Sequence, residues 1–533
     1  MLDRRTFRAR HLPMSLAFLA ITASSIAPTT ALAAQDCGAI ARLKIENANL
    51  LSATEVAASG DLPAYCRVLG YVRPAINFEI RLPLHDWNGK FYMTGCGGFC
   101  GILNADAPGF TNAMNFGLRR GYAVATSDSG HWGTSVIDGR WAMNNPVAQM
   151  DWGQRSVTET ARVAKVVIKS YYAAAQKKAY FAGCSTGGRM AVMEALRYPK
   201  DFDGIISGAP ALDYTGLVAT FFAWVAKANT GADGRPIFPP AKVKLLGDAV
   251  SAACGEKNTI AGGIIADPRA CHFDPAVLQC RAGDAPDCLT PAEVGVVAKW
   301  YRGAVDAHGR QLYPGGVPLG SEPHWRRWLT GTGTAPAVLP LFAQDFIRYM
   351  AFEPAAGSSF RVTDFDFDRD PQRMGFTAAM YNAATFNPTT GATDANDLAA
   401  FRQAGGKLLI YHGWADSLVT PQLTVDFYAA LAEKNGGFAA TQDFARLFMV
   451  PGMDHCGIQT EGPGIADTGL DALTALERWV EDGKAPSELI ATKTAPTGNA
   501  TLWQRPVCAY PKIARYGGSG DPNDAASYAC RDP

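Results

Sequence analysis

A serine at position 185 is the residue best placed for covalent chemistry. It lies in the pentapeptide 183–187, Gly-Cys-Ser-Thr-Gly, which fits the G-x-S-x-G pattern of a nucleophile on a sharp strand-to-helix turn. The apolar run 179–182 precedes it and the helix-compatible run 189–198 follows it. This context favours a nucleophile elbow over an inert glycine-rich turn. At the start of such a helix, the backbone N–H of Thr186 can donate to an oxyanion.

A serine hydroxyl needs a base, and the base needs an acid to orient it. The motif is accompanied by the chain order serine, acid, histidine, and His455 is the last histidine of the chain. It follows the strand-like run 447–450, so it is expected on a loop beyond a strand end, where an isolated histidine would otherwise be structural. Asp416 is the predicted acid. Asp454 is the competitor, but it can hardly reach the ring of its own neighbour.

Two of the twelve cysteines flank these residues: Cys184 directly precedes the predicted nucleophile, and Cys456 directly follows the predicted base. A disulfide requires Cα atoms about 5.5 Å apart. Joining these two cysteines would therefore bring Ser185 and His455 together from distant parts of the chain. The alternative is that each pairs elsewhere.

A glycine-rich loop supplies a candidate second oxyanion donor. Residues 95–101, Gly-Cys-Gly-Gly-Phe-Cys-Gly, follow the apolar run 91–93. Folds that contain the G-x-S-x-G turn place a loop with an oxyanion donor after such an early strand. The N–H of Gly97 is the predicted donor, with Gly98 next, and a plain glycine turn is the alternative. Its cysteines have the closest spacing in the chain, and the glycines between them favour a tight local bridge over zinc.

The N-terminus predicts export. Four arginines within residues 4–10 precede the apolar run 12–26, and an Ala-Leu-Ala site ends at residue 33. The run is shorter than the roughly 20 residues of a membrane span, so 1–33 is interpreted as a cleaved signal rather than an anchor. The paired arginines also fit a twin-arginine signal, and the export route stays open. In a secreted or periplasmic protein, twelve cysteines predict six disulfides.

Composition excludes several classes of protein. Lys+Arg and Asp+Glu are 49 each, which argues against nucleic-acid partners and, after signal cleavage, against a membrane-surface protein. With 48% hydrophobic and 18% charged residues, disorder over most of the length is excluded. A chain of 533 residues is long enough for more than one domain.

Short, continuously apolar runs alternate with helical patterns such as 157–172, which predicts a mostly parallel α/β sheet. The region 211–395 lacks this alternation of strand and helix patterns and is interpreted as an inserted domain. The catalytic domain is then 34–210 together with 396–533. The predicted strands are 91–93, 122–125, 179–182, 204–206, 408–411 and 447–450.

The Cys-Ser, Asp and His-Cys pattern resembles the tannase/feruloyl esterase family, over nearly the whole mature chain. That family includes mono(2-hydroxyethyl) terephthalate hydrolase. The resemblance implies an α/β-hydrolase fold with a large inserted lid domain and catalytic Ser185, Asp416 and His455. It also implies the bridges Cys184–Cys456, Cys37–Cys66, Cys254–Cys271, Cys280–Cys288 and Cys508–Cys530, with Cys96–Cys100 as an extra bridge that not every member has.

One departure from the family concerns calcium. Members usually carry an acidic calcium loop in the lid, but here Gly255, Asn258 and Gly262 occupy the positions of the acidic ligands. Calcium prefers several oxygen ligands, usually carboxylates. We therefore expect no tightly bound calcium, although Glu256 leaves room for a weak site, and no organic cofactor.

These features predict an exported serine esterase that acts on small esters of aromatic acids through an acyl-enzyme. The family ranks feruloyl or related hydroxycinnamoyl esters first, followed by galloyl esters and terephthalate monoesters. One alternative is a serine peptidase on the same scaffold, which the lid and the paired cysteines disfavour. The other is a non-catalytic binding protein with a hydrolase fold, which the intact Ser185, Asp416 and His455 disfavour.

Overall fold

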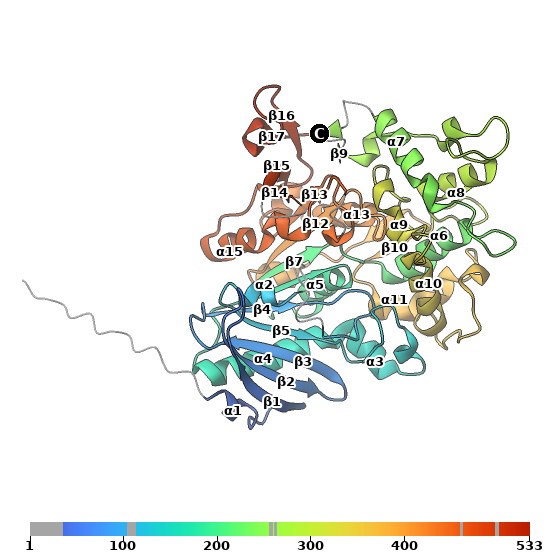
Figure 1. Ribbon diagram of the computed structural model, residues 1–533. Coiled ribbons are helices and arrows are strands. Elements are labelled where there is room, and N and C mark those ends of the chain that lie inside the picture. The colour runs from blue at the N-terminus through green and yellow to red at the C-terminus, as the bar shows by residue number, and fades with distance from the viewer. Residues whose placement is uncertain (1–35, 104–112, 255–258, 261–263, 459–461, 496–499) are drawn as a thin grey trace, which may run out of the picture. The chain divides into compact units, whose positions relative to one another are not determined.

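Nine strands form one mixed sheet in the computed structural model, in the order β1-β2-β3-β5-β4-β6-β7-β12-β13 (Figure 1). The structure describes residues 36–103, 113–254, 259–260, 264–458, 462–495 and 500–533. The strands of this sheet are β1 Ala48–Val56, β2 Tyr65–Val72, β3 Ile76–Pro83, β4 Lys90–Thr94, β5 Ala123–Ser127, β6 Lys178–Cys184, β7 Gly204–Gly208, β12 Lys407–Gly413 and β13 Ala445–Val450.

The six adjacent strands β5, β4, β6, β7, β12 and β13 are parallel to one another, and they contain the six predicted apolar runs except Tyr122, which directly precedes β5. Every residue of β5 and β7 is buried, as expected for strands covered on both faces. The strands β1, β2 and β3 add an antiparallel edge that the sequence analysis did not predict. A large, mostly parallel sheet whose strands alternate with helices confirms the predicted α/β class.

Helices follow most of the parallel strands. The predicted helical face within 157–172 is confirmed, because Val157, Ala161, Ala164 and Val167 are all buried on α4. The main helices of this part are α4 Ser156–Tyr172, α5 Thr186–Arg197, α13 Gln422–Lys434 and α15 Ala472–Asp482; the short ones are α1 Cys37–Ile40, α2 Asn115–Leu118, α3 Pro146–Met150, α12 Ala399–Gln403 and α14 Phe438–Thr441.

The segment 211–395 lies between β7 and β12 and is largely helical. It packs onto the rest of the chain through polar contacts as well as apolar ones: Tyr381 Oη donates to Gln149 Oε1 at 2.8 Å, and Gly139 N donates to Asp345 Oδ2 at 3.0 Å. Its boundaries as a domain and its action as a lid stay predictions. Its elements are α6 Phe222–Ala228, α7 Val243–Cys254, α8 Pro291–Arg302, α9 Trp325–Trp328, α10 Val338–Tyr349, α11 Gly375–Tyr381, and the pairs β8 Thr259–Ile260 with β9 Ile264–Ile265 and β10 Thr385–Asn387 with β11 Ala392–Asp394.

Two antiparallel ribbons end the chain: β14 Glu488–Thr494 with β15 Thr501–Cys508, and β16 Ile513–Tyr516 with β17 Tyr528–Arg531. Six disulfides are present, and they have the pairing that the family resemblance implies. They are Cys37–Cys66, Cys96–Cys100, Cys184–Cys456, Cys254–Cys271, Cys280–Cys288 and Cys508–Cys530.

Two sequence predictions fall outside the described residues. The export signal at 1–33 is one, and the altered calcium loop with Gly255, Asn258 and Gly262 is the other. In the described part of the chain, no helix combines the length and the apolar character needed to cross a membrane.

Candidate active site

Ser185 alone makes the turn between a strand and a helix, because β6 ends at Cys184 and α5 begins at Thr186. Its φ of 65° and ψ of −122° lie in a region that costs a residue with a side chain about 1–3 kcal/mol. Two hydrogen bonds fix this backbone: Ser185 N donates to Gly208 O at 2.9 Å, and Ser185 O accepts from Arg189 N at 3.0 Å. The serine is half-buried. This geometry matches the predicted elbow.

The glycines around the elbow are needed for close backbone contact. A Cβ atom on Gly183 would lie 2.5 Å from the carbonyl carbon of Gly187, and one on Gly95 would lie 2.7 Å from the Cα of Gly187. Real Cβ atoms do not approach other atoms so closely. Glycine at these positions therefore lets the loop 95–101 pack directly against the first turn of α5.

His455 and Asp416 come from the ends of neighbouring parallel strands, β13 and β12. His455 Nδ1 lies 2.7 Å from Asp416 Oδ2, and both side chains are buried. The other carboxylate oxygen, Oδ1, accepts hydrogen bonds from Leu418 N at 2.9 Å and Val419 N at 2.8 Å. The carboxylate that contacts the imidazole Nδ1 is thus that of Asp416, the residue favoured over Asp454.

His412 is a further member of this network, and the sequence analysis assigned it no role. Its Nε2 lies 2.8 Å from Val419 O and 3.2 Å from Asp416 Oδ2, and its Nδ1 lies 2.8 Å from Thr424 Oγ1. A carbonyl oxygen can only accept, so Nε2 carries the proton and Nδ1 accepts from the threonine. His412 is the penultimate residue of β12, four residues before Asp416, and this spacing alone does not mark it as a partner of the acid.

The charge state of Asp416 follows from two opposed effects. Burial raises the pKa of this carboxyl, but electrostatic attraction to the His455 side chain and hydrogen bonds from His412 and His455 outweigh it, and the pKa is lowered to about 2. Asp416 is therefore a carboxylate at neutral pH. A neutral imidazole that donates from Nδ1 to this carboxylate has Nε2 as its acceptor, on the side away from Asp416.

The disulfide Cys184–Cys456 joins the elbow to the histidine loop, with Cα atoms 6.0 Å apart. Cys456 Sγ lies 3.6 Å from His455 Nε2, so the bridge also contacts the ring nitrogen that faces away from Asp416. Ser185 and His455 are each adjacent to one of the bridged cysteines. The structure thus brings the predicted nucleophile, base and acid into one neighbourhood.

The two predicted oxyanion donors lie on elements that are hydrogen-bonded to each other. Thr186 is the first residue of α5, where an N–H has no acceptor within the helix. Its Oγ1 donates to Gly98 O at 2.6 Å, and Tyr214 Oη donates to the same oxygen at 3.2 Å. Gly97 precedes this anchored carbonyl and is half-exposed.

The inserted segment reaches the site through α9 and the turn before it. The ring of Trp328 stands edge-on to that of His455, with centroids 5.8 Å apart and an angle of 90°. His324 is buried nearby, and burial lowers its pKa to about 4. Trp325, in contrast, packs against Trp300 within the segment.

No group of three or more His, Cys, Asp and Glu side chains that could hold a metal ion occurs in the described ranges of the chain. The expectation of an esterase without metal or organic cofactor stays a prediction.

Comparison with known proteins identifies the family. The family described as tannase and feruloyl esterase matches residues 60–531. Mono(2-hydroxyethyl) terephthalate hydrolase of Piscinibacter sakaiensis is 33% identical over 90% of this chain and 87% of its own. A probable feruloyl esterase of Arthroderma benhamiae is 31% identical over 86% of this chain and 83% of its own. The solved structure of feruloyl esterase B from Aspergillus oryzae matches with a TM-score of 0.77 and 25% identity, over 93% of this chain and 100% of that one. The chain therefore belongs to the tannase and feruloyl esterase family and is a carboxylic ester hydrolase with an α/β-hydrolase-like fold.

Proposed function

We propose that this chain is an exported serine esterase that hydrolyses esters of aromatic acids through Ser185, His455 and Asp416. The proposal rests on one observation above all. The buried 2.7 Å contact between His455 Nδ1 and Asp416 Oδ2 is tied to the Ser185 turn by the Cys184–Cys456 bridge. A serine, an imidazole and a carboxylate joined in this way suit nucleophilic acyl transfer.

In the proposed reaction, Ser185 Oγ attacks the ester carbonyl carbon while its proton passes to His455 Nε2. The N–H groups of Thr186 and Gly97 donate to the oxyanion of the tetrahedral intermediate. The carbon–oxygen bond to the alcohol then breaks, and the imidazolium returns the proton to the leaving alcohol. Water, deprotonated by the same imidazole, hydrolyses the acyl-enzyme and releases the acid.

Aromatic side chains around the site support an aromatic acid as the acyl group. Phe99, in the oxyanion loop, packs against Phe342 at 5.1 Å and against Phe346 at 6.2 Å between ring centroids. Trp328, at the end of α9 in the inserted segment, contacts the His455 ring. Aromatic rings favour offset or edge-on contact with a further ring. We rank hydroxycinnamoyl esters first, then galloyl esters and terephthalate monoesters, in line with the names of the relatives.

A substrate panel tests the proposal. Methyl ferulate, methyl p-coumarate, methyl gallate and mono(2-hydroxyethyl) terephthalate are assayed beside methyl acetate and a chromogenic peptide, with wild type and Ser185→Ala. We expect the highest kcat/KM for one of the aromatic esters and a loss of about 10⁵-fold in kcat for Ser185→Ala. A fluorophosphonate should label the wild type once per chain, at Ser185. Equal activity in both proteins would refute the serine mechanism, and dominant cleavage of the peptide would favour a peptidase. Binding of an ester without turnover would favour a binding protein.

Export is tested on the chain expressed with its own N-terminus. We expect the mature protein to begin at Ala34 and to appear outside the cytoplasm. Replacing Arg4 and Arg5 together by lysine should stop export by the twin-arginine route and leave the general route working. An uncut chain that remains in the membrane would contradict the cleaved signal.

A further inference from the structure

The loop 95–101 carries one of the proposed oxyanion donors, and its composition would give it little stiffness of its own. It contains four glycines, and glycine loses more conformational freedom on ordering than any other residue. Three of its residues have positive φ: Gly98 at 60°, Cys100 at 64° and Gly101 at 81°. Something must hold such a loop in a single conformation if its amides are to stabilise a transition state.

The amides at the tip of the loop are not held by hydrogen bonds of their own. Among the described residues, the N–H groups of Cys96, Gly97 and Gly98 donate to no other group of the protein. Gly97 and Gly98 are half-exposed, whereas the two cysteines are buried. Consecutive amides left open in this way are suited to an anion.

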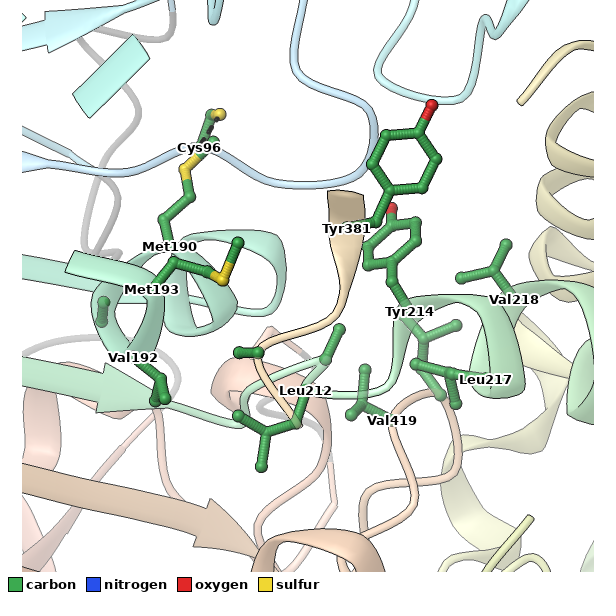
Figure 2. Close-up of a cluster of buried hydrophobic side chains, with 14 of the residues drawn as sticks. Cys96, Met190, Val192, Met193, Leu212, Tyr214, Leu217, Val218, Tyr381 and Val419 are labelled. Carbon is green, nitrogen blue, oxygen red and sulfur yellow. Dashed lines mark hydrogen bonds between the residues drawn. The ribbon is translucent and has the colours of Figure 1, made fainter. Parts of the chain in front are cut away.

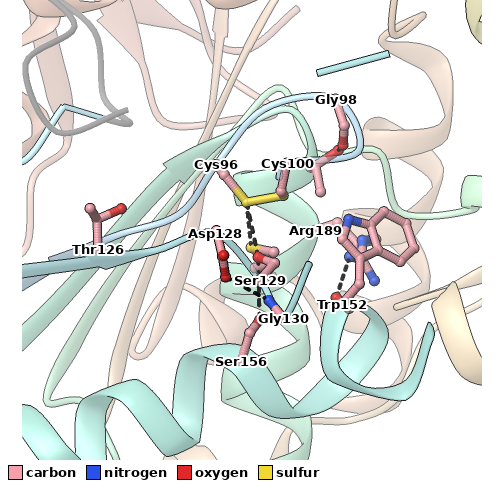
Figure 3. The surroundings of a disulfide bond; sticks show 12 residues. Cys96, Gly98, Cys100, Thr126, Asp128, Ser129, Gly130, Trp152, Ser156 and Arg189 are labelled. Carbon is pink, nitrogen blue, oxygen red and sulfur yellow. Dashed lines mark hydrogen bonds between the residues drawn. A yellow bond between two sulfur atoms is a disulfide. The ribbon is translucent and has the colours of Figure 1, made fainter. Parts of the chain in front are cut away.

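The disulfide Cys96–Cys100 closes the loop around these amides (Figure 3). Inside the ring, Cys100 N donates to Gly97 O at 3.0 Å, so the bridge and a backbone hydrogen bond define the same tight turn. Outside it, Gly95 N donates to Ala182 O at 2.9 Å and Gly101 N donates to Asp128 O at 3.0 Å. Between these ends, the Gly98 carbonyl accepts from Thr186 Oγ1 and Tyr214 Oη, and Phe99 N donates to Val136 O at 2.6 Å. The bridge closes the same turn next to Gly97, so the Gly97 and Gly98 amides stand between anchored points.

The bridge is itself held by the scaffold on two sides. Ser129, directly after Asp128, has its Oγ 3.2 Å from Cys96 Sγ, and a bridged sulfur can only accept, so the serine donates (Figure 3). On the other side, Cys96 Sγ lies 3.9 Å from Sδ of Met190, which belongs to α5 (Figure 2). Because α5 begins with Thr186, the bridge contacts the helix that carries the second proposed donor.

We propose that Cys96 and Cys100 are positioning residues of this esterase: their bridge holds the Gly97 and Gly98 amides at a fixed place relative to the Thr186 amide. This inference deepens the proposed function and rests on it. Donors that are in place before reaction avoid a reorganisation cost at the transition state. The bridge should therefore affect kcat much more than KM, since a loose loop weakens binding of the tetrahedral state more than binding of the ester.

The test compares two double variants, Cys96→Ser with Cys100→Ser and, as matched control, Cys508→Ser with Cys530→Ser. The control removes a bridge between β15 and β17, and neither double variant leaves an unpaired thiol. For the first variant we expect kcat to fall by about 30-fold and KM to change by less than about threefold, the cost of a mispositioned oxyanion donor. The inhibition constant of phenylboronic acid, a tetrahedral mimic, should rise in parallel with the loss of kcat/KM, while that of the product acid stays within about twofold. The control should keep its kcat.

The outcomes separate this inference from the proposed function. If Ser185→Ala keeps wild-type turnover, the proposed function fails and the inference fails with it. If Ser185→Ala is inactive while the Cys96/Cys100 variant keeps a kcat within twofold of wild type, or loses no more than the control, only the positioning role is overturned.

If the double variant does not fold, Ser129→Ala replaces it, because it keeps the bridge and removes the hydrogen bond to Cys96 Sγ. We expect about a fivefold lower kcat at unchanged KM, equivalent to one ordinary hydrogen bond. A kcat unchanged from wild type would overturn the positioning role.

Discussion

Replacing Asp416 by asparagine should leave the shape of the site intact but move the His455 proton from Nδ1 to Nε2. Asp416 Oδ1 accepts from two backbone amides, those of Leu418 and Val419. The side-chain oxygen of an asparagine must therefore take the Oδ1 position, and its NH₂ group must take the Oδ2 position, facing His455 Nδ1. The imidazole then accepts at Nδ1 and carries its proton on Nε2, where it cannot act as a base toward Ser185.

The magnitude has a catalytic and a stability component. Holding the base in the wrong tautomer lowers kcat by about 10⁴-fold, or about 5.5 kcal/mol of barrier. For stability, lowering the Asp416 pKa from 3.8 to about 2 corresponds to about 2 kcal/mol. Because the folded-state pKa is the lower one, this contribution is present above pH 3.8 and is lost as the pH falls through about 2. In Asp416→Asn it is absent, and the new NH₂ also meets the Nε2–H of His412.

The assay is steady-state hydrolysis of methyl ferulate with denaturant unfolding in parallel, on Asp416→Asn and on the matched variant Asp454→Asn. Asp454 is equally buried and adjacent to the histidine, so it controls for a general effect of removing a buried carboxylate. We expect kcat to fall by less than about tenfold in Asp454→Asn, the cost of an ordinary hydrogen bond. A loss of about 10⁴-fold in Asp454→Asn with near-normal turnover in Asp416→Asn would refute the assignment of the acid.

Three further predictions concern residues outside the proposed triad. Replacing Cys184 and Cys456 together by serine should lower the unfolding free energy by about 2–5 kcal/mol and kcat by about 100-fold, and unchanged kinetics would overturn the idea that this bridge aligns the triad. His412→Phe should lower kcat by about tenfold at constant KM, because Asp416 loses a charge-assisted hydrogen bond; a selective rise in KM would argue against a positioning role. Burial lowers the pKa of His131 from 6.5 to about 4, so the unfolded chain binds that proton first and stability falls between pH 6.5 and 4, by up to about 3 kcal/mol. His131→Phe should flatten this dependence in thermal unfolding, and the same slope as wild type would exclude His131 as its source.

The parallel strands were predictable because their physics is local. Runs such as 204–206 are apolar on both faces, and only strands buried on both sides need that pattern. The edge strands could not be recognised in the same way. In β1, buried, half-buried and exposed positions mix without strict alternation, and a register shift between Leu50 and Ser52 breaks the period of two. This segment is a strand because it pairs with β2, and such pairing cannot be inferred from the residues of one segment alone.

In the candidate site, too, some residues are marked by local sequence patterns and others only by contacts made on folding. Ser185, Asp416 and His455 could be proposed from the sequence because a motif and a chain order mark them. His412 and Ser129 could not, because each acts through a contact made only after folding: His412 with Asp416 Oδ2, and Ser129 with a disulfide sulfur. Neither contact follows from residue type.

Strand order explains why a covalent link is useful here. The proposed nucleophile, Ser185, follows β6 and His455 follows β13, and β7 and β12 lie between these strands in the sheet. Three strand spacings amount to about 14 Å, whereas the Cα atoms of Cys184 and Cys456 are 6.0 Å apart. The loop after β13 must therefore turn back across two strands to reach the elbow. The hydrogen bond to Asp416 holds it only to the adjacent strand, β12. The bridge supplies the remaining constraint, directly beside Ser185 and His455, the proposed nucleophile and base.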